Sequence, residues 1–60
     1  MNNLFEVGKT YKIEDFNQSY YTATIISEND QAIYFTDKHG HKGGLSKMEI
    51  KRWKEVQPNE

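Results

Sequence analysis

The sequence has no cysteine, only one proline and four glycines. Without cysteine there is neither a disulfide framework nor a cysteine-ligated zinc site, and without a long apolar run there is no transmembrane helix. The first residues resemble no secretory signal, so we expect a soluble cytoplasmic protein. A chain of 60 residues predicts a single small domain over 1–60, with its core at about 4–56 and a frayed tail at 57–60.

The apolar residues that are present favour β-strands. There are four tyrosines, three phenylalanines and one tryptophan, and aromatic and β-branched side chains suit a pleated, half-buried surface. Turn signals recur roughly every 8 to 15 residues, which is typical of short antiparallel strands. Apolar and polar residues alternate, so one face of each strand is predicted to enter a common core formed by Tyr11, Ile13, Tyr21, Ala23, Ile25, Ile33 and Phe35.

The segments 20–27, 31–37 and 41–45 are predicted to form a three-stranded antiparallel meander. For its first turn we expect a three-residue loop over 28–30, whose last residue, Asp30, adopts the left-handed conformation. Core residues then face core residues, and the expected pairs are Ile25 with Ile33 and Ala23 with Phe35.

The second turn of the meander is predicted to end at Gly40, again in the left-handed conformation. This turn places Phe35 opposite Gly43 and Ile33 opposite Leu45. A large ring then lies beside a residue without a side chain, which is the pairing that close packing requires.

The C-terminal segment has two interpretations. Ser46 to Glu49 match a capping box, Ser-x-x-Glu, and Ile50, Trp53 and Val56 recur with a near-helical spacing of three. The first interpretation is a helix from 47 to about 56. The second, which we favour, is one helical turn near 46–49 followed by a closing strand from 50 to 56 that covers an open sheet edge.

A first strand is predicted over 9–14, where apolar and polar residues alternate, and a longer loop follows it. The order of this strand, the loop, the meander, a short turn and a last strand resembles that of the small SH3-like barrels. The segment 21–37 reads Ala-x-Ile, then Glu-Asn-Asp, then Ile-x-Phe-x-Asp, and is similar to the central hairpin of Sm-like proteins. The step from 44–46 into 48–50 looks like the run into their last strand. The resemblance implies an all-β, five-stranded SH3-like barrel with one short helical turn, and a binding function without catalysis. Residues 32–34 contain no asparagine where the Sm-like family places a base-contacting one.

A face of exposed aromatic and aliphatic residues is our first candidate site. In the expected register, Tyr20, Ile26 and Tyr34 lie on the side away from the core, with Trp53 at the rim. Such a patch indicates an interface. We therefore expect a non-enzymatic binding module, an adaptor, an inhibitor or a self-associating protein, that acts through protein–protein contacts. The alternative is that the N-terminal segment 4–7 folds over this face.

Charge is unevenly distributed, and this supports a second candidate function. Residues 1–37 sum to −4, whereas residues 38–54 sum to +5. Cations beside aromatic rings are typical of nucleic-acid binders, with Tyr20, Tyr34 and Trp53 as stacking platforms. The alternative function is thus a nucleic-acid-binding barrel, and its predicted site residues are Lys38, His39, His41, Lys42, Lys51, Arg52 and Lys54.

No catalytic or metal-binding constellation is evident in the sequence. The three serines lack a nucleophile setting and are interpreted as turn or cap residues. His39 and His41 stand near Asp37, but a fourth ligand for zinc is missing. We therefore expect no enzymatic activity, no cofactor and no metal ion.

Overall fold

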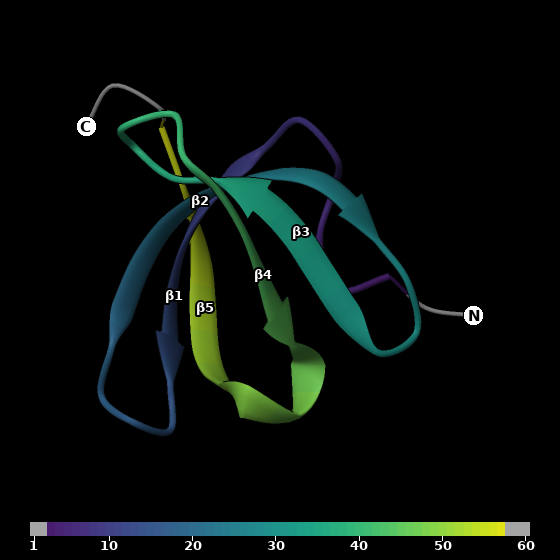
Figure 1. The fold of residues 1–60 in the computed structure, drawn as a ribbon, viewed down its shortest axis with the longest axis vertical. Helices are drawn as coiled ribbons and strands as arrows, with labels where there is room; N and C mark the ends of the chain where they lie inside the picture. Colours follow the sequence, from purple (N-terminus) through teal and green to yellow (C-terminus); the bar gives the residue numbers. More distant parts are fainter. Residues whose placement is uncertain (1–2, 58–60) are drawn as a thin grey trace.

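The computed structural model of the chain describes residues 3–57, which form one five-stranded antiparallel sheet and a short helical turn (Figure 1). The elements are β1 (Thr10–Asp15), β2 (Tyr20–Glu28), β3 (Ala32–Thr36), β4 (Lys42–Ser46), the 3-10 turn η1 (Lys47–Glu49) and β5 (Ile50–Val56). The predicted all-β class is confirmed. Of the predicted frayed tail, all but Gln57 lies outside the described residues.

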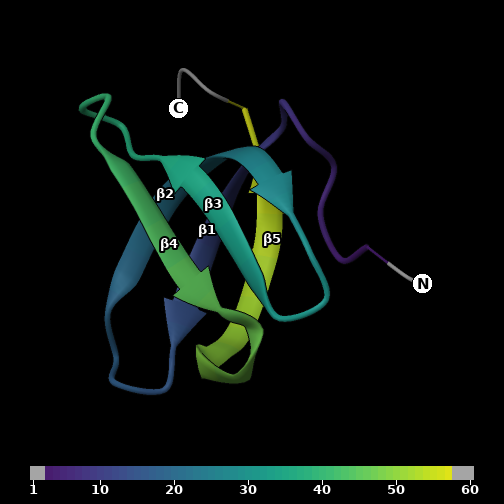
Figure 2. The same cartoon turned by 45° about the vertical axis from the view of Figure 1, so that its right-hand side comes forward.

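The strands follow the order β4-β3-β2-β1-β5 in the sheet, so β4 and β5 are its two edges. The sheet curls strongly, and η1 joins the two edge strands at one end (Figures 1 and 2). The sheet is not closed by hydrogen bonds between β4 and β5. The outer backbone N–H and C=O groups of these two strands therefore remain available for pairing with another strand.

The core lies on one face of the curled sheet, as the alternation of apolar residues predicts. Across β1 and β2, Tyr11 pairs with Ala23 and Ile13 pairs with Tyr21. Tyr21 is half-buried, while the buried apolar residues are Phe5, Tyr11, Ile13, Ala23, Ile25, Ile33, Phe35, Leu45 and Ile50.

The register of β2 against β3 differs from the predicted one. Ile25 pairs with Phe35 rather than Ile33, and Ala23 has no partner on β3. β2 continues to Glu28, which pairs with Ile33, and the register shifts by one residue at Ile26. Without this β-bulge Ser27 would lie opposite Ile33; with it, Glu28 takes that position, and its side chain is 1% exposed.

The turn between β2 and β3 is stabilised by a side chain rather than by a left-handed residue. The Oδ1 atom of Asn29 accepts hydrogen bonds from the backbone N–H groups of Gln31 and Ala32, both at 2.8 Å. Among residues 3–57, the one non-glycine residue with positive φ is Gln18. The predicted left-handed conformation of Asp30 is therefore wrong.

The predicted register of β3 against β4 is confirmed. Ile33 pairs with Leu45, and Phe35 pairs with Gly43. A Cβ atom on Gly43 would lie 3.1 Å from Cε1 of Phe35, so the ring occupies the place of the missing side chain. Gly40 closes the turn with a φ of 83°, a conformation that favours glycine.

The C-terminal segment is a helical turn followed by a strand, and the interpretation as a longer helix is wrong. Ser46 caps η1, and its hydroxyl accepts a hydrogen bond from Met48 N at 3.2 Å. The chain then becomes extended at Ile50, because pairing with β1 satisfies the backbone of both strands, with Trp53 opposite Ile13.

The turn between β1 and β2 is organised by the buried carboxylate of Asp15. Its Oδ1 atom accepts hydrogen bonds from Asn17 N and Ser19 N, both at 2.9 Å, and its Oδ2 atom accepts one from the Tyr21 hydroxyl at 3.1 Å. These bonds favour the charged carboxylate, so they lower the pKa of Asp15, the bond from Ser19 most of all.

The N-terminal segment covers the core and leaves the outward face of the sheet free. Phe5 is buried, with its ring centroid 5.0 Å from that of Tyr11 and 5.2 Å from that of Trp53. Leu4 and Val7 are exposed. The alternative, that this segment folds over Tyr20, Ile26 and Tyr34, is wrong, since all three of those side chains are exposed.

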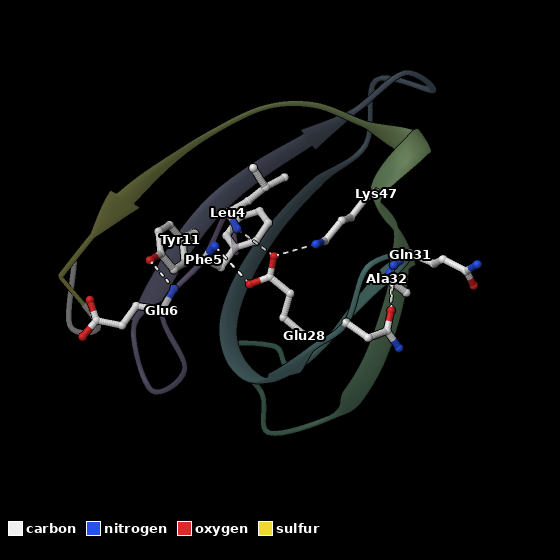
Figure 3. A network of polar contacts seen from close by, with 9 residues as sticks. Leu4, Phe5, Glu6, Tyr11, Glu28, Gln31, Ala32 and Lys47 are labelled. Carbon is white, nitrogen blue, oxygen red and sulfur yellow. Dashed lines mark hydrogen bonds and ion pairs between the residues drawn. The ribbon is translucent and has the colours of Figure 1, made fainter. Parts of the chain in front are cut away.

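Glu28 ties this segment to the sheet, although the sequence presents it as a turn residue (Figure 3). Its carboxylate accepts hydrogen bonds from Leu4 N at 2.8 Å and from Phe5 N at 3.1 Å, and it lies 2.8 Å from the Lys47 Nζ atom. The side chain is 1% exposed. Burial raises the pKa of Glu28, but the contacts with Lys47 and the two N–H groups outweigh it and lower the pKa below its usual value.

Candidate functional site

Two rows of side chains cross the outward face of β5, β1 and β2. In the first row, Glu14 pairs with Arg52 on one side and with Tyr20 on the other. In the second row, Lys12 pairs with Lys54. Residues that are directly opposed share one face of a sheet, so these five side chains stand together on the side away from the core.

Lys12 and Lys54 are like charges placed directly opposite each other. Such a pair destabilises a sheet, and within residues 3–57 neither lysine lies within ion-pair distance of a carboxylate. Lys38 and Lys42 also lack an ion pair in the described chain. Lys12 and Lys54 therefore keep uncompensated positive charge on this face.

Arg52 and Lys51 are in a different situation, because they share one carboxylate. Glu14 Oε1 lies 3.2 Å from Arg52 Nε, and Glu14 Oε2 lies 4.0 Å from Lys51 Nζ. Glu14 offsets one of these two positive charges. These contacts hold Arg52 beside the Lys12–Lys54 pair.

Tyr20 lines two shallow hollows. The first has a volume of about 390 Å³ and is lined by Lys12, Tyr20, Tyr21, Thr22, Asp37, Lys38 and His39. The second has a volume of about 240 Å³ and is lined by Lys12, Ile13, Glu14, Tyr20, Arg52, Trp53 and Lys54. These volumes are near or below the lower end of the range for pockets that enclose a small molecule.

The structure divides the residues that the sequence assigns to a protein-binding face. Tyr20 is 76% exposed at the start of β2, whereas Ile26 lies six residues further along, about 20 Å away at ~3.3 Å per residue. Tyr34 belongs with Ile26, because it pairs with the neighbouring Ser27. One predicted patch is thus two separate ones.

Trp53 lies apart from both groups. It pairs with Ile13 on the core-facing side of the sheet, and its ring packs against Phe5. Although it contributes to the lining of the second hollow and is 39% exposed, its ring is committed to the margin of the core. It is therefore poorly placed to act with Tyr20.

The basic residues predicted from the sequence also form two groups. Lys38, His39, His41 and Lys42 surround the β3–β4 turn, while Lys51, Arg52 and Lys54 lie on β5 at the opposite edge of the sheet. The hollows bring members of both groups to Tyr20. Lys12 lines both hollows, but sequence reasoning missed it because it lies in the acidic half of the chain. Its outward position in the alternation of β1 was the available signal.

Asp37 holds the β3–β4 turn together. Its Oδ1 atom accepts hydrogen bonds from His39 N at 2.8 Å and His41 N at 2.9 Å. These bonds, that of His41 most of all, lower the pKa of Asp37.

Among residues 3–57, no group of three or more potential ligands is arranged to hold a metal ion. In the same part of the chain, no helix is long and apolar enough to cross a membrane.

Comparison with known protein families, with curated sequences and with solved structures found no match for this chain. Any functional assignment therefore depends on the geometry of the site itself.

Proposed function

We propose that this protein is a non-catalytic module that binds nucleic acid on the outward face of β5, β1 and β2. The observation that carries the proposal is the Lys12–Lys54 pair, which has no carboxylate partner in the described chain and lies beside the exposed ring of Tyr20. Phosphate groups relieve the repulsion between two such lysines and release counterions when they bind.

The same proposal includes the type of fold. Five antiparallel strands in this order, strongly curled and with a 3-10 turn before the last strand, support an SH3-like barrel. The core fills the inside of the curl, which leaves the outward face of the sheet for a ligand. The module then works by binding, with no catalytic role for its side chains.

A salt series with the wild-type protein and two variants tests this function. The affinity of a fluorescently labelled 20-nucleotide strand of mixed sequence is measured by anisotropy at several salt concentrations, and log K is plotted against log [salt]. The double variant Lys12→Gln/Lys54→Gln should lower the slope by about 1.4, because each phosphate contact with a single strand contributes about 0.7.

Lys9→Gln is the matched control, because Lys9 carries the same charge but lies 3.9 Å from the carboxylate of Glu55. It should leave the slope unchanged. Affinity that does not depend on salt, or an equal loss of slope in the control and in the double variant, would contradict the proposal.

A second candidate function is self-association at the β4 edge. From Gly43 to Ser46 this edge strand carries no charged side chain, whereas β5 carries Lys51, Arg52, Lys54 and Glu55. Charged residues protect exposed edges against pairing. The exposed Tyr34 ring lies over Gly44, within 3.2 Å of where a Cβ atom would be.

An antiparallel pair of β4 strands centred on Gly44 places Lys42 of one copy opposite Ser46 of the other, so that no like charges meet. Sedimentation velocity at increasing protein concentration tests this candidate. Tyr34→Ala should weaken the dimer, and Tyr20→Ala should not. A wild-type protein that stays monomeric at all concentrations would rule it out.

A further inference from the structure

Tyr20 differs from the two tyrosines that build the core. The hydroxyl of Tyr11 accepts a hydrogen bond from Glu6 N, and that of Tyr21 donates one to Asp15; both rings also pack against phenylalanine rings. In the described part of the chain, the ring of Tyr20 has no such aromatic neighbour. At 76% exposure, its flat face is accessible.

Both hollows that this ring lines also contain cations. Lys38 lines the first hollow, Arg52 and Lys54 line the second, and Lys12 lines both. The ring therefore forms part of the wall of two positively charged hollows.

Carboxylates near the hollows are already engaged. Both Asp37 oxygens face the β3–β4 turn: Oδ1 accepts two backbone N–H groups, and Oδ2 lies 3.8 Å from the Nδ1 atom of His41. Glu14 is held by Arg52 and Lys51. These contacts lessen the repulsion that an anionic ligand would meet in either hollow.

We propose that the ligand is a single strand with unpaired bases, one of which stacks on Tyr20 while its flanking phosphates lie in the two hollows. The inference rests on the proposed function and deepens it, because phosphate contacts alone do not discriminate between single strands and duplexes. Stacking on an aromatic ring requires a free base face. In a duplex each base is already stacked between its neighbours, so it offers no free face to the Tyr20 ring.

Ligands that differ only in their bases test the role of stacking. Anisotropy titrations at one low salt concentration compare labelled 15-mers of thymidine and of uridine with an abasic 15-mer that has the same number of phosphates. Wild-type protein should bind both pyrimidine strands more tightly than the abasic strand. Tyr20→Ala should weaken binding of the pyrimidine strands by about 5- to 150-fold, which corresponds to stacking of one base, and should leave abasic binding unchanged.

Two further variants serve as controls. Tyr20→Phe keeps the ring and should retain the affinity, while Tyr34→Ala removes an exposed ring at the other end of the face and should have no effect. Because Tyr20 is exposed, its variants are expected to fold, and matching urea midpoints check this.

The failures of the two proposals are distinguishable. Equal binding of the abasic and pyrimidine strands, or binding of a 15-base-pair duplex as tight as that of the single strands, overturns the stacking inference and leaves nucleic-acid binding in place. No binding of any of these ligands at low salt overturns both.

Discussion

Lysine has opposite roles at two places in this small sheet. At the end of β2, Lys47 lies 2.8 Å from Glu28, whose buried carboxylate also holds the N-terminal segment. On the outward face, Lys12 lies opposite Lys54, with no carboxylate in ion-pair distance among residues 3–57. The first lysine is paired within the fold. The second has no partner there, at some cost in stability, and in the function that we propose it is available to a ligand.

The largest expected effect comes from removing the buried carboxylate. Glu28→Ala leaves Lys47 and two backbone N–H groups without their partner, so it should lower the free energy of unfolding by about 2–3 kcal/mol, near the low end for breaking a buried pair because Lys47 keeps some access to water. Urea denaturation followed by circular dichroism measures the change.

Glu14→Ala is the control for that variant, because Glu14 also contacts two cations but these are exposed. Its effect should stay below about 1 kcal/mol. Equal losses in the two variants would mean that the buried network has no special role in the fold.

Lowering the pH should also destabilise the contacts of the buried carboxylate, but by less than Glu28→Ala does. The reason is that a protonated carboxyl group still keeps some of its contacts. The pKa values of Glu28, Asp15 and Asp37 are lowered in the folded protein. Their stabilising contributions are therefore complete above the unfolded-state pKa values and are lost as the pH falls through the folded-state values. Urea midpoints measured from about pH 6 to pH 3 should fall, and Glu28→Gln should flatten part of this decline. A variant as acid-sensitive as the wild type would show that Glu28 is not involved.

The smallest expected effect has the opposite sign. Lys12→Gln removes one member of the like-charge pair and should raise the free energy of unfolding by about 0.2–0.5 kcal/mol at low salt. The gain should disappear at about 1 M salt, where exposed charges are screened. If Lys12→Gln instead lowers the free energy of unfolding at low salt, Lys12 stabilises the fold, and its charge is not kept at a cost in stability.

The sequence was sufficient to predict the elements whose constraints are local. The β3–β4 hairpin is specified by Gly40, which closes the turn, and by Gly43, which makes room for the ring of Phe35. The alternation in β1 and β2 placed the core residues correctly. These features depend on steric rules that act over a few residues.

The features that the sequence did not predict depend on competition between distant groups. The bulge at Ile26 places Glu28 rather than Ser27 opposite Ile33, on the core-facing side of β2. Glu28 resembles a turn residue until the N-terminal segment and η1 fold against it. For the same reason, the charge excess of 38–54 did not indicate Lys12, which strand pairing places opposite Lys54 in the interface that we propose.

The central claim, that Lys12 and Lys54 serve a ligand while Lys47 and Glu28 serve the fold, is tested most directly by an NMR titration with a 15-mer of thymidine. The backbone amide shifts of Lys12, Tyr20 and Lys54 should change in a saturable way, while those around Glu28 and Lys47 stay constant. Shift changes confined to the Glu28–Lys47 region or to Tyr34 and β4 would contradict the claim.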